Sequence, residues 1–395
     1  MKIAADMQES QARVERLLPT VAPHVAQVLE RAMAGQELSR EDGLTLAALT
    51  GSDVEVLAAV ADHVRREVKG DLITYVVNRN INFTNVCFIG CKFCSFSTSA
   101  RAENAYNLSF EEIARRTIEA HELGATEVCV QGGLPRGLDP FYYRDILRTI
   151  KSAVPEMHTH AFSPMEMTYG TELTGMSLRD YLQMLKDNGL DTLPGTAAET
   201  LDDDVRYVLS RRKVTVKQWV NVVKTAHSLG IPTTSTMMYG HVEQPEHWVN
   251  QLILLRDIQK DTGGFTEFVP LAFVHTNTDL FRIGIARPGP TEEESVKVHA
   301  LARLLLRGWI DNVQVSWVKM GRKLSQRIMQ AGANDYGGTL MDENISRLAG
   351  ATAGQYMPPE EFRQLIREIG RVPGERTTTY TIRQVFDRET EEVPV

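Results

Sequence analysis

The sequence predicts an α/β protein whose main part is a (β/α) TIM-like barrel. From Asp71 onward, short runs rich in β-branched and aromatic residues alternate with longer amphipathic stretches, which is the pattern of repeated βα units. Polar and glycine-rich loops follow directly after these runs, and a barrel builds its active site from the loops at the carboxyl ends of its strands. The 395 residues suffice for one barrel and additional segments.

Helices are expected before the barrel, and a short extension after it. Apolar residues recur at helical spacing from Val14 to Met33 and from Val54 to Val64. Near the C-terminus, "MPPEEFRQLIREIG" predicts a capped helix and "RTTTYTIRQVF" a β segment. We therefore expect an N-terminal helical segment over residues 1–70, the barrel over 71–350 and a C-terminal helix and β extension over 351–395.

The strands of the barrel are predicted from the β-rich runs, which are "LITYVV", "TEVCVQ", "MHTHAF", "LDTLP", "IPTTSTMM", "FTEFVPLAF", "NVQVSW" and, more weakly, "ANDYGG". Two intervening helices have recognisable starts, because Ser109 with Glu112 and Thr215 with Gln218 match the spacing of a capping box. Periodicity alone does not distinguish a closed eight-stranded barrel from a splayed six-stranded one.

Composition and charge exclude several functions. Apolar residues at 43% and charged residues at 24% are typical of a globular chain with a large core. A net charge of −8 argues against a nucleic-acid or anionic-membrane partner. No apolar run reaches the length of a membrane span, and the start of the chain has no signal-peptide core. We expect a cytoplasmic protein, in which clustered cysteines bind metal or do chemistry more often than they form disulfides.

Three of the four cysteines, Cys87, Cys91 and Cys94, lie within "CFIGCKFC", with the spacing C-x3-C-x2-C. Structural zinc sites close with four ligands, and no second Cys/His pair at suitable spacing follows. Three buried core thiols are a poor explanation for a loop that also contains glycine, lysine and serine. A [4Fe–4S] cluster prefers thiolates, and three ligands leave one iron open for a substrate or cofactor.

This motif on the loop after the first strand resembles the radical S-adenosylmethionine (SAM) superfamily. The resemblance implies a radical SAM core whose cofactors are a [4Fe–4S] cluster and SAM, with Cys87, Cys91 and Cys94 as the iron ligands. It further implies that Phe93 packs near the adenine and that "QGG" contacts the methionine end of SAM. The predicted SAM-binding residues are Phe93, Gln131, Gly132, Gly133, Ser163, Thr196 and Glu199. Cys129, within an apolar strand, is expected to be a buried core thiol and not a ligand.

Within that superfamily the chain is similar to the deazaflavin-forming CofH family from about Tyr75 to Arg383. The resemblance is carried by "NINFTNVC", "AFSPMEM", "LPGTAAE", "MMYGHVE", "IARPGPT", "VQVSWVKMG" and "AGANDYGGTLM". Of these, "LPGTAAE" and "VQVSWVKMG" favour CofH over the menaquinone-pathway enzymes aminofutalosine synthase and dehypoxanthine futalosine cyclase, which are the alternative. A non-catalytic iron–sulfur scaffold is the alternative from a different class.

The CofH resemblance implies a transferase in the biosynthesis of the deazaflavin coenzyme F420. L-Tyrosine would be cleaved between Cα and Cβ, and its 4-hydroxybenzyl group would join C5 of 5-amino-6-(D-ribitylamino)uracil, with release of 2-iminoacetate, methionine and 5′-deoxyadenosine. With one C-x3-C-x2-C motif, the chain supplies only the first half of the deazaflavin synthesis. The resemblance therefore implies that a CofG-like ring-closing enzyme is the pathway partner. It also implies an electron donor such as flavodoxin or ferredoxin.

Hydrogen abstraction from the tyrosine nitrogen requires a base that first takes a proton from the ammonium group. Candidates for this base, or for a partner of the phenol, occur at predicted strand ends: His160, Tyr239, His241, Glu243 and His275. Residues that could hydrogen-bond the ribityl uracil are Ser316, Lys319, Asn334 and Asp335. Arg282 or Arg287 could bind a carboxylate. Each of these side chains could instead have a purely structural role.

Overall fold

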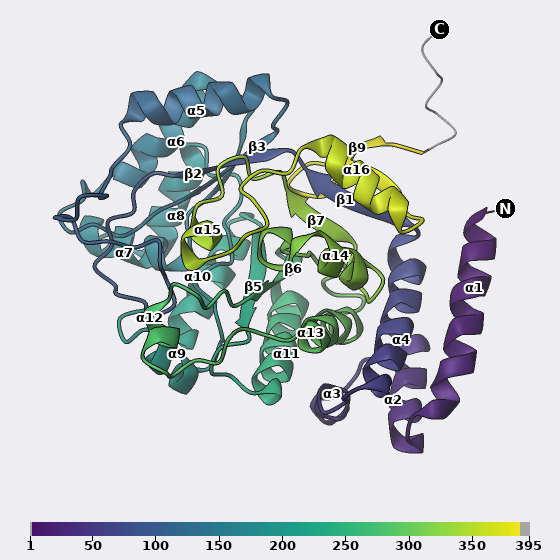
Figure 1. Ribbon diagram of the computed structural model, residues 1–395. Helices are drawn as coiled ribbons and strands as arrows, with labels where there is room; N and C mark the ends of the chain where they lie inside the picture. Colours follow the sequence, from purple (N-terminus) through teal and green to yellow (C-terminus); the bar gives the residue numbers. More distant parts are fainter. Residues whose placement is uncertain (1, 388–395) are drawn as a thin grey trace, which may run out of the picture.

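The computed structural model describes residues 2–387, and Figure 1 shows its elements. The N-terminal segment consists of α1 (Lys2–Leu17), a 3-10 turn (Leu18–Thr20), α2 (Pro23–Met33), α3 (Arg40–Ala47) and α4 (Ser52–Lys69). These helices lie together at one side of the molecule, in purple (Figure 1). The expected helical segment before the barrel is therefore present, with α3 as an additional helix.

The strands of the central region are β1 (Leu72–Val76), β2 (Asn78–Asn82), β3 (Glu127–Gln131), β4 (His158–Ala161), β5 (Thr233–Tyr239), β6 (Phe265–Ala272) and β7 (Asp335–Gly338). The helices between and after them are α5 (Phe110–Glu122), α6 (Tyr142–Ala153), α7 (Pro164–Thr174), α8 (Leu178–Asp187), α9 (Asp203–Leu209), α10 (Val216–Ser228), α11 (Pro245–Thr262), α12 (Asp279–Arg282), α13 (Glu292–Leu305), α14 (Trp317–Met329) and α15 (Ile345–Ala349). The chain ends with α16 (Pro359–Glu368), β8 (Val372–Arg376) and β9 (Ile382–Val385).

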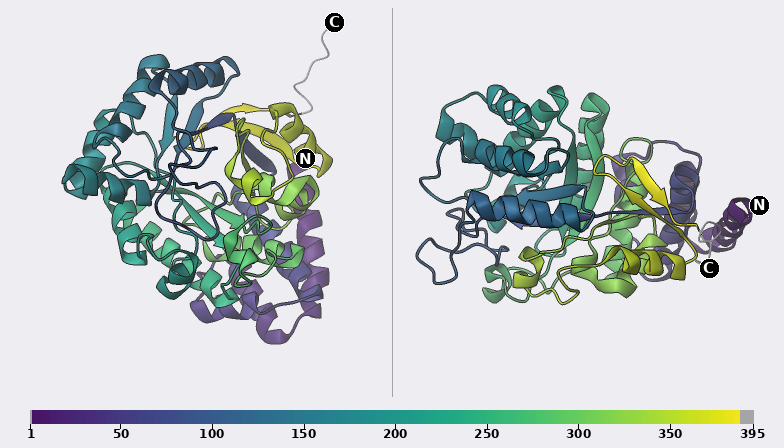
Figure 2. Two further views of the ribbon diagram at one scale, coloured as in Figure 1. Left: turned by 60° about the vertical axis from the view of Figure 1, so that its left-hand side comes forward. Right: turned by 90° about the horizontal axis from the view of Figure 1, so that it is seen from above.

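The strands form a TIM-like arrangement without a closed ladder. Three separate sheets are present among the described residues, with the orders β7-β1-β8-β9, β2-β3-β4 and β5-β6. All pairs are parallel except β8 with β9. Isolated bridges of Thr192 with His160 and of Leu193 with Thr233 connect β4 to β5, and Val313 and Gln314 bridge β6 to β7. Helices surround this strand region in both views of Figure 2.

Two of the predicted strands are wrong in extent. "LDTLP" and "NVQVSW" form single bridges and not continuous strands. The other predicted runs coincide with β1 and β3 to β7. Of the two predicted helix starts, Thr215 and Gln218 form a complete capping box, while Ser109 Oγ accepts a hydrogen bond from Glu112 N at the start of α5. The side chains thus satisfy amide groups that a helix start leaves free.

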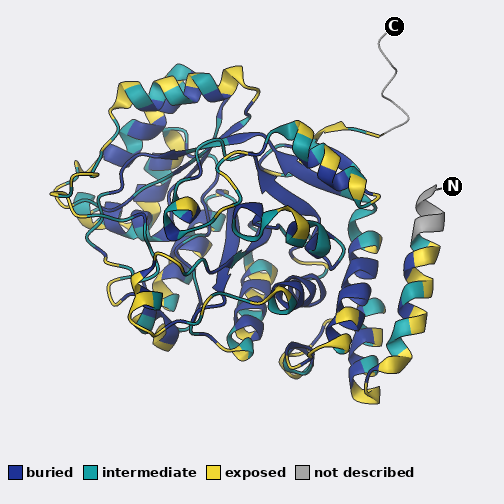
Figure 3. Cartoon of the chain, in the orientation of Figure 1, coloured by how far each residue is buried: buried dark blue, intermediate teal, exposed yellow. Residues whose placement is uncertain are grey.

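One large hydrophobic core extends through all three predicted segments, beside a small separate cluster that includes Leu209 and Leu280. The large core includes Val14 and Val60 in the N-terminal helices, Val128 in β3 and Ile366 in α16. Figure 3 shows the same distribution, with buried residues on the strands and on the inner faces of the helices. No helix among residues 2–387 is both long and apolar enough to cross a lipid bilayer. The domain boundaries at 70 and 350 stay predictions.

Buried ion pairs join α4 to the start of β8. The carboxylate of Asp62 lies 2.8 Å from Arg371 Nη2 and 3.0 Å from Arg65 Nε. Removing one partner of a buried ion pair leaves uncompensated charge, so we expect Asp62→Ala to lower the free energy of unfolding by about 3–5 kcal/mol. Denaturant unfolding measures this change. On the same helix, Glu55→Ala breaks an exposed ion pair with Arg327 and should cost about 1 kcal/mol or less. Equal effects of the two substitutions would contradict the prediction.

Candidate active site

Two connected cavities are formed by the strands, one extending between them and the other at their carboxyl ends. The larger, here called the lumen cavity, has a volume of about 340 Å³ and is lined by inward-facing residues of the strands, including Asn80, Cys129 and Thr236. The smaller, here called the cysteine cavity, has a volume of about 170 Å³ and is lined by Cys87, Cys91 and Cys94. Both cavities share a set of lining residues, namely Phe93, Cys94, Gln131, Thr196, Ala197, Glu199 and Ile345. A molecule bound at the cysteines therefore borders the lumen.

The three predicted iron ligands come together on the loop after β2. All three thiols are partly buried. Cys94 N donates a hydrogen bond to Cys91 O (3.1 Å), which turns the loop so that both side chains reach the same cavity. Burial raises the pKa of Cys91 to about 11, although Lys213 and the hydroxyl of Ser210 act in the opposite direction. Binding of iron to this thiol must therefore displace a proton.

The donor set fits an iron–sulfur cluster. No group of three His, Cys, Asp or Glu side chains in the described part of the chain gathers closely enough to hold a single metal ion. A cluster of several irons spreads its thiolate ligands more widely than one ion does, and the three thiols around one cavity suit this spacing. Thiolates are also the donors that such clusters prefer.

The glycine pair after β3 allows the chain to approach the cysteine loop closely. A Cβ atom at Gly133 would lie 2.2 Å from Val86 O and 3.0 Å from Cys87 Cβ. The amide groups of the pair are already used, since Gly132 N donates to Glu166 Oε1 (3.2 Å) and Gly133 N to Thr84 O (2.8 Å). Neither glycine carbonyl accepts a hydrogen bond from a described residue, so both can accept one from an ammonium group.

This contact predicts a specific loss on substitution. Because the clash at Gly133 is with backbone, Gly133→Ala should displace the Cys87 loop and weaken SAM binding to the reconstituted protein by about tenfold or more. Equilibrium dialysis with SAM and an iron assay measure the change. Gly137→Ala, on the same loop, is the control for backbone strain alone, because its φ of +73° disfavours a side chain while a Cβ there meets no atom within 4 Å. Wild-type affinity in Gly133→Ala would contradict this account.

The other predicted SAM-binding residues also lie at the cysteine cavity. Phe93 has the ammonium group of Lys213 4.9 Å from its ring centroid. Gln131 Nε2 donates to Thr196 Oγ1 (3.0 Å), which places both side chains between the two cavities. Glu199 pairs with Lys213, but its Oε2 is buried without a hydrogen-bond partner. Ser163 lines the cavity and caps α7. Their contacts with SAM stay predictions.

Of the five candidates for the base, His160 lines the lumen cavity. Its Nδ1 lies 2.8 Å from Thr192 Oγ1, and its Nε2 has no hydrogen-bond partner among the described residues. Burial lowers its pKa to about 4, so the imidazole is neutral at pH 7 and can accept a proton. His160 is thus a neutral imidazole at the cavity wall with a ring nitrogen not used by the described residues. A pKa this low makes it a weak base, and its role as the base stays a prediction.

The other four candidates lie outside the residues that line the two cavities. His241 and Glu243 are buried in contact with each other (3.1 Å), and His241 Nε2 lies 3.0 Å from Met238 O. Tyr239 is fully buried with its ring against Trp248, and His275 packs on Phe281. The structure thus gives these four residues structural contacts in place of the predicted position at the substrate.

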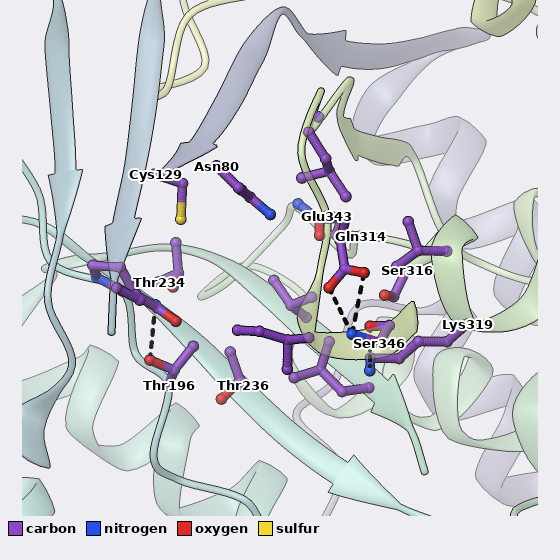
Figure 4. Close-up of a pocket in the computed structure, with 18 of the residues that line it drawn as sticks. Asn80, Cys129, Thr196, Thr234, Thr236, Gln314, Ser316, Lys319, Glu343 and Ser346 are labelled. Carbon is purple, nitrogen blue, oxygen red and sulfur yellow. Dashed lines mark hydrogen bonds between the residues drawn. The ribbon is translucent and has the colours of Figure 1, made fainter. Parts of the chain in front are cut away.

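The residues predicted to bind the substrates also fall into two groups, those that line a cavity and those that do not. Ser316 and Lys319 line the lumen cavity, and Lys319 Nζ donates to Ser346 Oγ (2.9 Å; Figure 4). Asn334 instead accepts a hydrogen bond from Arg303 (2.7 Å), and Asp335 pairs with Arg376 (2.6 Å). Arg287 pairs with Glu294 (2.6 Å), so a protein carboxylate already binds its guanidinium, whereas Arg282 is exposed and only 3.7 Å from Asp279, and neither arginine lines a cavity.

Some residues of the site were not predicted. Cys129 was expected in the core, but it lines the lumen cavity beside Asn80 and opposite Glu343 (Figure 4). Lys213 and Glu166 line the cysteine cavity. Burial raises the pKa of Glu166 to about 7, and hydrogen bonds from Ser163 and Gly132 oppose this. Its spacing from Ser163 is that of a capping box, which was a signal visible in the sequence.

Comparisons with known proteins agree with this geometry. Residues 81–254 match the model of the radical SAM superfamily, and residues 262–389 match that of the CofH/MqnC C-terminal region. The FeFe-hydrogenase maturase HydG from Carboxydothermus hydrogenoformans has a similar fold, with a TM-score of 0.72 and 17% identity over 96% of this chain and 86% of that chain. Methylornithine synthase PylB also has a similar fold, with a TM-score of 0.67 and 18% identity over 88% of this chain and 97% of that chain.

Close relatives are found among characterised families. The chain is 48% identical to the 5-amino-6-(D-ribitylamino)uracil–L-tyrosine 4-hydroxyphenyl transferase of Methanocaldococcus jannaschii, over 88% of this chain and 97% of that protein. It is 52% identical to the FO synthase of Mycobacterium leprae, over 87% of this chain but 40% of the relative, so it spans less than half of the FO synthases. The chain therefore belongs to the radical SAM superfamily and, within it, to the family of the 5-amino-6-(D-ribitylamino)uracil–L-tyrosine 4-hydroxyphenyl transferases.

Proposed function

We propose that this enzyme transfers the 4-hydroxybenzyl group of L-tyrosine to C5 of 5-amino-6-(D-ribitylamino)uracil, a step in the synthesis of the deazaflavin chromophore of coenzyme F420. The observation that carries the proposal is the 48% identity over nearly the whole archaeal transferase. The connected cavities support it, because the site that binds the cofactors must border a second site that accommodates two organic substrates. The futalosine alternative is not favoured by these relatives.

Each cavity has a separate task. The thiolates of Cys87, Cys91 and Cys94 would hold three irons of a [4Fe–4S] cluster, with the fourth open to SAM. Bound together, these cofactors supply a carbon-centred radical able to remove a hydrogen atom from the substrate. The walls of the lumen keep bulk water away from such reactive species.

The protein's own groups position the substrates and move protons. His160 would take a proton from the ammonium group of tyrosine, after which the nitrogen loses a hydrogen atom to form 5′-deoxyadenosine. The Cα–Cβ bond then breaks, with Cβ bonding to C5 of the pyrimidine and the remaining fragment leaving as 2-iminoacetate. The adduct then gives up one proton to solvent and one electron to the oxidised form of the electron donor, so that no further oxidant is consumed. Lys319, buried at the lumen wall, is suited to bind the carboxylate of the amino acid.

Two proteins are expected to act with this one. The product still lacks its third ring, so a CofG-like ring-closing enzyme must consume it. Reductive cleavage of SAM needs one electron from a donor such as flavodoxin or ferredoxin. Both partners follow from the chemistry of the proposed reaction and are part of the proposal.

An anaerobic assay tests the function. The reconstituted protein is incubated with SAM, a reductant, tyrosine and the ribityl uracil, and each substrate is omitted in turn. We expect 5′-deoxyadenosine and a coupled product that requires both substrates, both detected by mass spectrometry. If formation of 5′-deoxyadenosine does not depend on tyrosine but requires futalosine-type compounds, the proposal is refuted.

A further inference from the structure

The lumen cavity changes in character along its length. Parallel strands bring their carboxyl ends to the cysteine side, so the residues at their starts lie at the opposite end, here called the base of the lumen. On β2 and β3 the register aligns Asn78 with Glu127 at the base and Asn80 with Cys129 farther up. All four residues line the cavity. This wall is polar throughout.

The facing wall along β6 is polar only at the base, while Thr236 on the neighbouring β5 adds one polar group at the middle level. Along β6, the cavity-lining residues are Glu267, then Val269, then Leu271. The register pairs Leu271 with Met238 at the upper level, and Phe273 lines the cavity beyond the end of the strand. The upper lumen, next to the cysteine cavity, therefore offers apolar contacts, whereas two carboxylates face the base.

The base has hydrogen-bonding capacity that the protein does not use. Glu267 Oε2 accepts hydrogen bonds from Gln314 Nε2 (3.1 Å) and from the hydroxyl of Tyr380, but Oε1 has no partner among the described residues. Thr378 Oγ1 is buried, lines the cavity and has no hydrogen-bond partner. The guanidinium of Arg376 lies 3.5 Å from Glu267 Oε2 and helps to fix the carboxylate in place.

These groups suit hydroxyl donors. Burial raises the pKa of Glu267 to about 7, with Arg376 acting in the opposite direction. The ionised group accepts hydrogen bonds and disfavours the acidic end of an amino acid, and the protonated group can also donate to a hydroxyl. A polyol is neutral and brings several hydroxyls, each able to donate to one acceptor and accept from another. Two cations line the lumen cavity, and the guanidinium of Arg376 at the base is already bound to both carboxylate oxygens of Asp335. Lys319, in contrast, is hydrogen-bonded to the hydroxyl of Ser346 and is suited to a substrate carboxylate (Figure 4).

The chemistry imposes the same orientation. The pyrimidine carbon that forms the new bond must lie beside the tyrosine Cβ, near the cysteine cavity. The ribityl chain does not react and is the part of this substrate that can extend away from the cofactors. We propose that the base of the lumen binds the ribityl chain, with Glu267 and Thr378 as determinants of specificity for a polyol-bearing pyrimidine. This inference rests on the proposed function.

If the proposal is correct, the C-terminal segment from β8 to β9 takes part in substrate recognition. Arg376 ends β8, and Thr378 and Tyr380 follow it on the turn to β9. Their side chains reach Glu267 or the cavity. A segment that looks like a peripheral extension in the sequence thus forms part of the substrate site.

Binding to Glu267→Gln tests the proposal. The reconstituted holoenzyme with SAM but without reductant is titrated with 5-amino-6-(D-ribitylamino)uracil and, separately, with 5,6-diaminouracil, which lacks the ribityl chain. At a pH of about 8.5, above the raised pKa of about 7 of Glu267, the group is ionised. We expect Kd for the ribityl compound to rise about tenfold or more at this pH, since a neutral amide replaces the charged acceptor, and Kd for 5,6-diaminouracil to stay within about twofold. Thr378→Val should act in the same direction with a smaller effect.

Tyr380→Phe is the matched control, because it removes a hydrogen bond to Glu267 from behind and leaves the cavity lining intact. Its Kd for the ribityl compound should change by less than about threefold. Equal losses for both pyrimidines in Glu267→Gln, or no loss in either Glu267→Gln or Thr378→Val, would overturn the inference. A loss confined to tyrosine binding would overturn it too, by placing the phenol at the base. If the wild-type protein binds neither pyrimidine, the proposed function itself fails.

Discussion

Replacing Cys91 by Ala is expected to abolish both cluster incorporation and the formation of 5′-deoxyadenosine. Cys91 is one of three thiols around a single cavity, and two thiolates are too few to hold a cluster that is already one ligand short of the usual four. We expect less than about a thousandth of the wild-type rate, since the loss of a metal centre removes the chemistry and not merely an orienting contact. Iron content and anaerobic product analysis measure the two effects.

The fold should survive this substitution, because Cys91 lies on a loop and its side chain contacts Ser210 (3.4 Å) at the edge of the cavity. Cys129→Ala is the matched control. It removes the remaining thiol of the chain, which lies on β3 and lines the lumen but not the cysteine cavity. This variant should retain its iron. Product formation by Cys91→Ala, or loss of iron from Cys129→Ala, would show that the ligand set is misassigned.

The periodic parts of the fold were predictable from the sequence. Strands such as β5 and β6 are long apolar runs between turn signals, and the helices begin with recognisable caps. β2 escaped prediction because its sequence, "NRNIN", is polar, and strand propensity describes residues that pack in a half-buried sheet. Asn78 and Asn80 line the polar lumen, so this side of β2 has no apolar residues to mark a strand although Asn78 is buried.

The site was predictable where a motif fixes the chemistry. The cysteine spacing predicts the ligand set, and the three thiols do line one cavity, whereas a histidine at a strand end has no such signature. His160 and His241 occupy similar positions in the sequence, but His160 lines the lumen while His241 turns into the protein against Glu243. The side-chain direction that separates them depends on tertiary packing. Glu127 and Glu267 were not predicted as site residues, because a glutamate near the start of a strand has no distinctive sequence signature. Only the folded chain shows that both line the same cavity.

The geometry of His160 leads to the second large effect. His160→Gln keeps a side chain able to hydrogen-bond Thr192 but removes the group that accepts a proton. We expect the rate of tyrosine-dependent deoxyadenosine formation to fall by about 10²–10⁴-fold, the usual contribution of a positioned base. SAM binding and iron content should be unchanged, and the loss should lie in kcat more than in KM, because the proton transfer and not substrate binding is impaired.

His158→Gln distinguishes this role from a structural one. His158 lies on the same strand, and its Nε2 is 2.8 Å from the same hydroxyl of Thr192, but it lines neither cavity. If both variants lose activity equally, the Thr192 contacts support the strand and His160 is not the base. Since burial lowers the pKa of His160 to about 4, its neutral form prevails at every pH above that value. The wild-type rate should therefore lose this contribution only as the pH falls toward 4, and a decline centred near pH 6.5 would point to another group.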